Sequence, residues 1–187
     1  MQKKKILTLG IATGLFLVIG LGNASAEHTR RNNGKLAGTF LSTRMDINDD
    51  GSLATWSTSL NTGTLGRRTV QGISESVPTG ATTECPGGVS IIDAPNSIGF
   101  STATATFPNG DQLYGRIRTR TQCGLGGGRF ETNEIVEVLG GTGKFAGASG
   151  TTEVHSVSQC QAFDANATPP QCFGSFTGEF TGTITLP

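Results

Sequence analysis

The segment Leu139-Gly140-Gly141-Thr142-Gly143-Lys144-Phe145-Ala146-Gly147-Ala148-Ser149-Gly150 decides how this chain folds. It holds five glycines in twelve residues and lies between two segments of alternating character. Glycine accepts positive φ angles without steric cost, so such a segment permits tight turns and close backbone approach. The segment therefore predicts a tight connection between two β-strands.

Short β-like runs recur at regular spacing on both sides of this turn. Each run is bounded by Gly, Pro, Asn or Asp, and no amphipathic helix pattern separates them. The runs cover 35–43, 53–60, 67–76, 89–92, 98–107, 111–121, 129–139, 150–159 and 173–186. Eight or nine such strands predict an all-β protein, either an antiparallel sandwich or a closed barrel.

The clearest hairpin signal is Phe107-Pro108-Asn109-Gly110-Asp111-Gln112-Leu113. Asn-Gly supplies the two positive-φ residues of a type I′ turn. Alanine and phenylalanine alternate with threonine over 102–107, and apolar residues or glycine alternate with tyrosine and arginine over 113–120. This part of the sheet is therefore expected to have one apolar face and one basic or hydroxyl-rich face.

The last run alternates glycine with large apolar residues on one face. That face carries Gly174, Phe176, Gly178, Phe180, Gly182, Ile184 and Leu186. Glycine allows a strand to bend sharply, and rings from neighbouring positions can cover the gaps that glycines leave. Small barrels need both features at their corners, so this run favours the closed barrel.

The first 26 residues have the pattern of a secretory signal peptide. Three lysines precede an apolar run from Ile6 to Leu21, which ends in Ala24-Ser25-Ala26. The run is about 16 residues long and broken by glycines, shorter than the ~20 residues of a spanning helix. We expect cleavage after Ala26, no membrane anchor thereafter, and a secreted or periplasmic protein.

The remaining chain is expected to be one domain. Residues 27–34 are polar and predict a loose N-terminal arm, and 35–187 has the length of a single domain with its own core. Without the three leader lysines, the formal charge falls from zero to about −3. No long basic block remains, which argues against nucleic acid as a partner.

All four cysteines follow the leader, and an even number in an oxidising compartment predicts two disulfides. We favour Cys160–Cys172, which closes a short loop, and by elimination Cys85–Cys123. Zinc is the alternative, but the chain has no CxxC pair and only two histidines. We therefore expect no metal at the cysteines.

Two motifs have alternative readings as ligand sites. The 141–146 segment fits a loose dinucleotide pattern, but Phe145 stands where a phosphate-binding loop needs Ser or Thr, and no helix pattern follows. The 46–51 segment resembles the start of a calcium loop, but Ser57 stands where a bidentate Glu is required. The first reads better as a strand connection and the second as a hairpin turn.

Four residues are candidates for chemistry. Glu137 shares a face with Ile135 and Leu139, so it could point into an apolar interior, where its pKa would rise and it could act as an acid or base. The alternative is a solvated strand carboxylate. Arg116 and Arg118 belong to a basic stripe that either faces solvent or holds an anionic group. His155 lies within a strand, so it is a ligand-binding candidate.

The ordered combination Asn109-Gly110-x-x-Leu113, then Ile135-Val136-x-Val138-x-Gly140-Gly141-Thr142-Gly143-Lys144-Phe145, resembles the dirigent proteins. It is similar, more distantly, to the allene oxide cyclases. The resemblance covers roughly residues 98–160, and the motif turn is carried by Gly140, Gly141, Thr142, Gly143 and Phe145. The chain departs from both families in a cysteine-bearing, glycine-rich insert over 122–129 and in the sequence that follows Phe145.

The resemblance implies a closed, eight-stranded antiparallel barrel with a largely apolar cavity, often trimeric and needing no cofactor. It assigns no functional residue. The function it implies first is binding of a small apolar or aromatic molecule in the barrel. The alternatives are a cofactor-independent cyclase or isomerase, and a structural or adhesion module whose barrel is filled.

Overall fold

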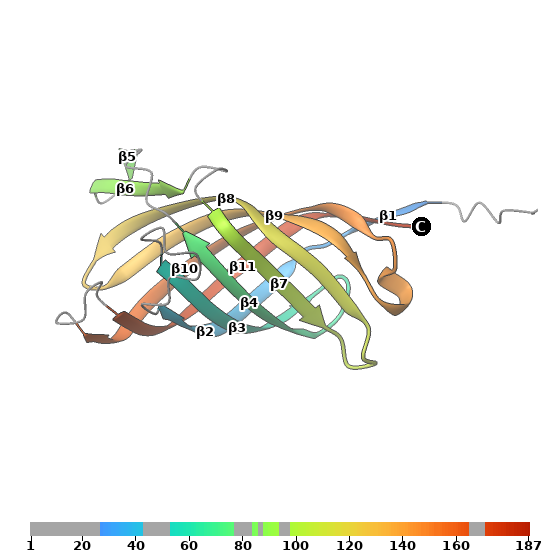
Figure 1. The fold of residues 1–187 in the computed structure, drawn as a ribbon, viewed down its shortest axis with the longest axis horizontal. Helices are drawn as coiled ribbons and strands as arrows, with labels where there is room; N and C mark the ends of the chain where they lie inside the picture. Colours follow the sequence, from blue (N-terminus) through green and yellow to red (C-terminus); the bar gives the residue numbers. More distant parts are fainter. Residues whose placement is uncertain (1–26, 43–52, 77–83, 86–87, 94–97, 165–170) are drawn as a thin grey trace, which may run out of the picture.

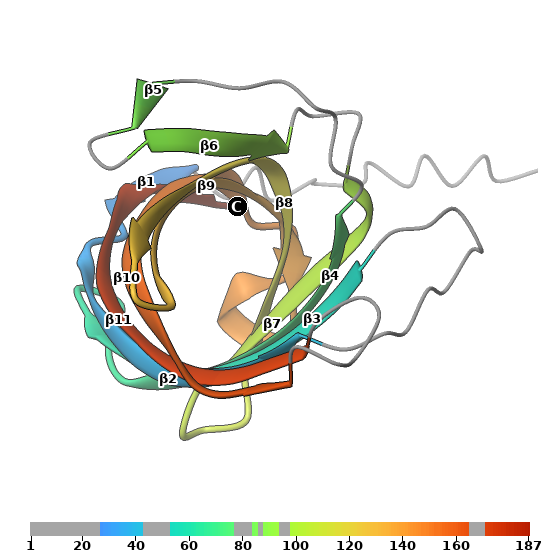
Figure 2. The same cartoon turned by 90° about the vertical axis from the view of Figure 1, so that its left-hand side faces the viewer.

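Eight strands close into one antiparallel barrel in the computed structural model, which describes residues 27–42, 53–76, 84–85, 88–93, 98–164 and 171–187 (Figures 1 and 2). The strands are β2 (Gly34–Ser42), β3 (Leu53–Gly63), β4 (Arg68–Ser76), β7 (Ile98–Thr106), β8 (Gln112–Gly126), β9 (Arg129–Gly141), β10 (Ser149–Asp164) and β11 (Gln171–Leu186). Each pairs with the next in this order, and β11 pairs back with β2. The predicted closed barrel is confirmed.

Strand β8 pairs with two different strands along one of its edges. Its first half pairs with β7, from Ala103↔Gly115 to Thr106↔Gln112. Its second half pairs with β6 (Gly88–Asp93), which in turn pairs with β5 (Glu84–Cys85). Between the two halves, the Ile117 N–H donates to Ser101 Oγ at 2.6 Å. A side chain therefore replaces the backbone acceptor where β7 and β8 diverge.

The segment predicted as a loose arm is ordered by pairing. β1 (His28–Arg31) pairs antiparallel with the end of β11, from His28↔Leu186 to Arg31↔Thr183. All four β1 residues are exposed, so no apolar alternation marks the strand. The pairing uses backbone groups that β11 presents beyond the end of β2.

A compact core closes the end of the barrel that carries the glycine turn (right-hand side of Figure 1). The turn contains one 3₁₀ helix, η1 (Gly143–Phe145), and the Phe145 ring stacks on Phe107 with centroids 4.5 Å apart. The buried cluster comprises Ala105, Phe107, Leu113, Val138, Phe145, Ala148 and Ile184. The glycine turn thus folds back over the barrel end and supplies part of its core.

The glycines of β2 and β11 lie beneath aromatic rings from neighbouring strands, as the alternating pattern predicted. A Cβ built on Gly34 would lie 2.6 Å from Cζ of Phe180, and one on Gly174 would lie 2.6 Å from Cε1 of Phe40. These rings cover surface that a glycine leaves bare, and the glycines give the strands room to curve.

Both predicted disulfides, Cys85–Cys123 and Cys160–Cys172, are present, at the barrel end opposite the glycine turn. The cysteine-bearing insert forms the end of the β8–β9 hairpin: β8 runs to Gly126, and the Cys160 N–H donates to Gly128 O at 2.8 Å. Two disulfides are consistent with an oxidising compartment. None of the described residues forms a helix of the length and hydropathy that crossing a bilayer requires.

Candidate functional site: the barrel interior

The barrel interior contains a cavity of about 390 Å³, lined by residues from all eight strands. Its volume depends on small residues at one level of the wall. Gly72 pairs with Ala103, and Ala103 pairs with Gly115, so three adjacent strands place almost no side-chain volume in the interior there. The interior is therefore hollow, in contrast to the filled barrel of the structural alternative.

Towards the core, most of the cavity wall is apolar. The aliphatic lining residues nearest the closed end are Leu36, Val70, Leu113, Val136 and Val138. They alternate with outward-facing residues along their strands, because successive side chains of a strand point to opposite faces. This part of the cavity offers an apolar molecule a surface to pack against.

Arg68 interrupts this apolar end. Only 4% of the residue is exposed, and its guanidinium lies 4.6 Å from the ring centroid of Phe180 and 5.7 Å from that of Phe107. Its Nη2 donates to Asn32 Oδ1 at 2.9 Å, whereas its Nη1 is buried without a hydrogen-bond partner. Desolvation by burial lowers the pKa of Arg68 to about 10, so the side chain remains a cation at neutral pH.

Asn32 fixes the position of Arg68. Its Nδ2 donates to Thr152 Oγ1 at 2.8 Å, and its backbone N–H donates to Gly182 O at 2.9 Å. The amide group is therefore held by β10 and β11 while its oxygen accepts from the guanidinium. The residue just beyond β1 thus becomes part of the cavity wall.

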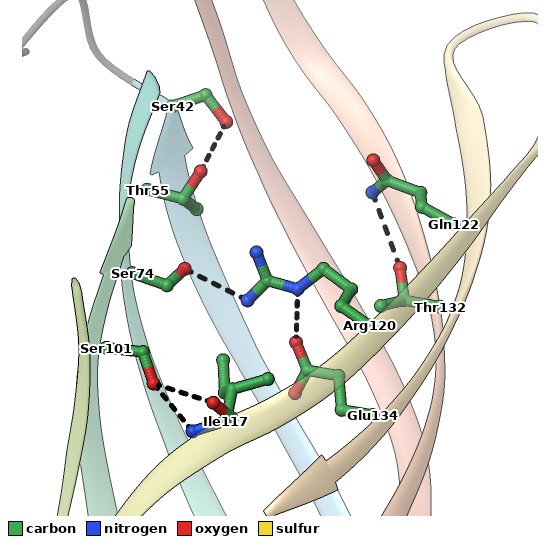
Figure 3. A network of polar contacts seen from close by, with 9 residues as sticks. All are labelled: Ser42, Thr55, Ser74, Ser101, Ile117, Arg120, Gln122, Thr132 and Glu134. Carbon is green, nitrogen blue, oxygen red and sulfur yellow. Dashed lines mark hydrogen bonds and ion pairs between the residues drawn. The ribbon is translucent and has the colours of Figure 1, made fainter. Parts of the chain in front are cut away.

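A second charged group crosses the cavity farther from the core (Figure 3). Arg120 Nε donates to Glu134 Oε1 at 2.7 Å, and Arg120 Nη2 donates to Ser74 Oγ at 2.9 Å. The side chains of Arg120 and Glu134 are only 14% and 19% exposed. This network joins β8, β9 and β4 at the level of the barrel where β7 and β8 are no longer paired.

Hydroxyl and amide groups line the cavity beyond this network. Ser42 and Thr55 lie 3.3 Å apart, and Gln122 Nε2 donates to Thr132 Oγ1 at 3.4 Å (Figure 3). The interior therefore changes from apolar near the core, where Arg68 is the charged residue, to polar towards the disulfides, where Arg120 and Glu134 form an ion pair.

Glu137 lies on the outer face of the barrel. Its neighbours Val136 and Val138 line the cavity, and its Oε2 accepts from Arg116 Nε at 2.7 Å and lies 3.5 Å from Arg118 Nε. The hydrogen bond from Arg116 lowers the pKa of Glu137, aided by the charges of both arginines. Glu137 is therefore the solvated strand carboxylate of the alternative interpretation, and the hypothesis of an inward carboxyl with a raised pKa is not supported, since the valines occupy the inner face.

His155 also lies outside the cavity. The lining residues of β10 are Thr152, Val154, Ser156 and Ser158, and the histidine has the opposite parity. Its Nε2 lies 3.1 Å from Glu131 Oε1. Arg116, Arg118, Glu137 and His155 are thus surface groups of the barrel wall, and the structure does not bring them together with the cavity.

The interior charges lie where sequence reasoning did not place them. Arg120 belongs to the same basic stripe as Arg116 and Arg118, but a register shift between Ile117 and Thr119 turns it inward. Such a bulge reverses the parity of every later residue, and nothing in strict alternation announces it. The sequence does indicate the inward orientation of Arg68. This residue lies two positions before Val70 in the same run, so both side chains are expected on the inner face of the strand.

The predicted leader (1–26) and the 46–51 turn lie outside the described residues. Within the described ranges, no group of three or more His, Cys, Asp or Glu side chains is arranged to hold a metal ion. The motif-turn residues Gly140 to Phe145 lie at the closed end of the barrel. The buried cluster around Phe145 at this end forms the floor of the cavity.

Comparison with known proteins identifies no family by sequence. No protein-family model matches the chain, and no curated protein matches it. One solved structure with a similar chain path is the pterocarpan synthase dirigent protein GePTS1, at 12% identity and a TM-score of 0.45, with 86% of each chain covered. The chain is an eight-stranded antiparallel barrel, and these comparisons assign it to no family.

Proposed function

We propose that this protein is exported and binds a small, largely apolar molecule inside its barrel, without a cofactor. The observation that supports the proposal is the cavity of about 390 Å³, apolar near the core and polar towards the disulfides. Binding sites for small molecules commonly have this size and combine an apolar lining with a few placed polar groups. The disulfides support export because they persist in oxidising compartments.

Native mass spectrometry of the protein purified from a secreting host, without organic solvent, tests this proposal. We expect a discrete small-molecule adduct, or uptake of fatty acids or phenols offered in excess. The same spectrum reports the oligomeric state, for which the resemblance to dirigent proteins predicts a trimer. A protein that takes up none of these molecules contradicts the proposal.

Filling the cavity should abolish uptake. Ala103→Phe places a ring in the cavity at the level of its strand partners Gly72 and Gly115, and we expect roughly a 10-fold or greater loss of affinity for any bound molecule. Thr104→Phe adds the same ring to the next residue of β7, which does not line the cavity. Isothermal titration calorimetry should show unchanged binding in this control. Equal binding by wild type and Ala103→Phe would place the ligand elsewhere.

A second candidate is a cofactor-independent isomerase or cyclase. Glu134 favours it, because this carboxylate lies in the cavity and is held by Arg120 at 2.7 Å. A buried carboxylate beside a bound molecule can move a proton. Chromatography of the bound molecule after incubation separates the two functions: a pure binder returns it unchanged. An isomerase returns a product of the same mass, and Glu134→Gln abolishes that conversion.

A further inference from the structure

The cavity carries an excess positive charge at its closed end. Among the described residues, the charged ones that line the cavity are Arg68, Arg120 and Glu134. With two cations and one anion, the lining has a net charge of one positive unit. Glu134 accepts from Arg120 at 2.7 Å, which accounts for that pair. No carboxylate in the described ranges forms an ion pair with Arg68. The positive charge that remains is that of Arg68.

A buried cation without an anion is costly, because transfer from water removes its hydration. Two phenylalanine rings and the Asn32 amide compensate part of this cost at Arg68. Nη1 remains buried with no acceptor. A guanidinium is a planar donor group that matches the two oxygens of a carboxylate. A carboxylate bound at Arg68 would therefore supply the acceptor that Nη1 lacks.

The surroundings of Arg68 fit the rest of such a molecule. Leu36, Val70 and Leu113 line the cavity at the same closed end, and all three are apolar. The Phe107–Phe145 stack belongs to the buried cluster that closes this end, so the space for a ligand body is the hollow interior beyond it. A carboxylate at Arg68 would thus carry an aliphatic or aromatic group that extends towards Arg120.

We propose that Arg68 binds the carboxylate of a small organic acid whose apolar body occupies the barrel. The proposal rests on the binding function proposed above and adds the chemical class of the ligand. Asn32 acts as a positioning residue, because its Oδ1 accepts from Arg68 Nη2 and both residues line the cavity. The Arg120–Glu134 pair, already neutralised, marks the polar limit of the ligand body.

Paired probes test this assignment on the intact protein. Octanoate and hydrocinnamate are compared by calorimetry with octanamide and hydrocinnamamide, which have the same shapes without the charge. We expect each acid to bind about 10- to 100-fold more tightly than its amide, as for a charge-assisted hydrogen bond. Comparison of the aliphatic and aromatic pairs shows which ligand body fits. If the amides bind as well as the acids, the assignment of Arg68 is overturned while cavity binding stands. If no probe binds, the binding function itself fails.

Arg68→Met should remove the preference for acids and leave the affinity for amides within about 3-fold. Arg116→Met is the matched control, since this arginine lies on the outer face and pairs with Glu137. Loss of the preference in both variants would indicate a general charge effect and contradict a site at Arg68.

A measurement without mutation covers the case in which Arg68→Met fails to fold. The carbon NMR shift of ¹³C-carboxyl-labelled octanoate, bound to the wild-type protein, is followed against pH. We expect the pKa of the bound carboxyl to lie below that of free octanoate, because a neighbouring cation favours the charged form. The other charged lining groups, Arg120 and Glu134, offset one another. A bound pKa equal to or above the free value would overturn the proposal.

Discussion

At the scale of single residues, one amide determines whether the buried guanidinium is tolerated. Asn32 accepts from Arg68 Nη2, donates to Thr152 Oγ1, and is anchored through its own N–H to Gly182. Strands β4, β10 and β11 therefore meet at one residue that is only 3% exposed. Removal of such a bridging group leaves two buried polar partners unsatisfied, which costs more than the bonds themselves contribute.

Asn32→Ala should lower the free energy of unfolding by about 1–3 kcal/mol, because Arg68 Nη2 and Thr152 Oγ1 lose their partner. Urea denaturation measures the change. Asn133→Ala, at an exposed position of β9, is the control and should change stability by less than about 0.5 kcal/mol. Equal effects of the two substitutions would show that Asn32 does not support the buried charge.

At the scale of elements, the glycine turn and the Asn-Gly hairpin form one unit. The Thr142 N–H donates to Gln112 O at 2.8 Å, and the Gln112 N–H donates to Thr142 Oγ1 at 2.9 Å. Gly143 has φ near +55° and lies against the carboxylate of Asp111, where a Cβ would overlap that group. Two turns far apart in sequence thus position each other over the barrel floor.

Gly143→Ala should destabilise the protein by about 1–3 kcal/mol, because alanine must adopt a left-handed conformation and displace Asp111. Thermal and urea denaturation measure the loss. The double variant Gly143→Ala with Asp111→Ala should recover the part due to overlap. Gly124→Ala serves as the control, since a Cβ there meets nothing within 4 Å. A neutral Gly143→Ala would show that the turn is not held against the hairpin.

The elements that could be predicted from sequence are those with alternation and turn signals. All nine predicted runs correspond to strands, because each is a short β-like run bounded by turn-forming residues. β1 was not predicted because all its side chains are exposed, so no alternation marks it. The inward orientation of Arg120 was not predicted because a bulge in β8 changes which residues face the interior. The candidate site was therefore predicted as a barrel interior, but none of the four candidate residues lines the cavity.

At the scale of the whole molecule, the two ends of the barrel are stabilised differently. The glycine-turn end has the buried apolar cluster around Phe145 and Ile184. The opposite end has the Ser42–Thr55 hydroxyl pair inside and carries the two disulfides. Covalent links are most useful where a hollow, polar interior provides little apolar burial.

The Cys160→Ser, Cys172→Ser double variant should lose about 2–4 kcal/mol of unfolding free energy, because the bridge closes a short loop in the unfolded chain. We expect the circular dichroism signal of the β-sheet to remain, since β10 and β11 pair along most of their length. A reductant should shift the wild-type denaturation midpoint in the same direction. An unchanged midpoint in the double variant would show that the bridge is dispensable.

The barrel is packed at the glycine-turn end and hollow beyond it, and this division has an evolutionary consequence. Substitutions at Gly72, Ala103 or Gly115 alter the shape of the interior without entering the cluster around Phe145. Selection for folding acts mainly on the floor and its turns, whereas selection for a new ligand can act on the walls. Descendants of this barrel would then retain the glycine turn as their common signature and diverge in what they hold.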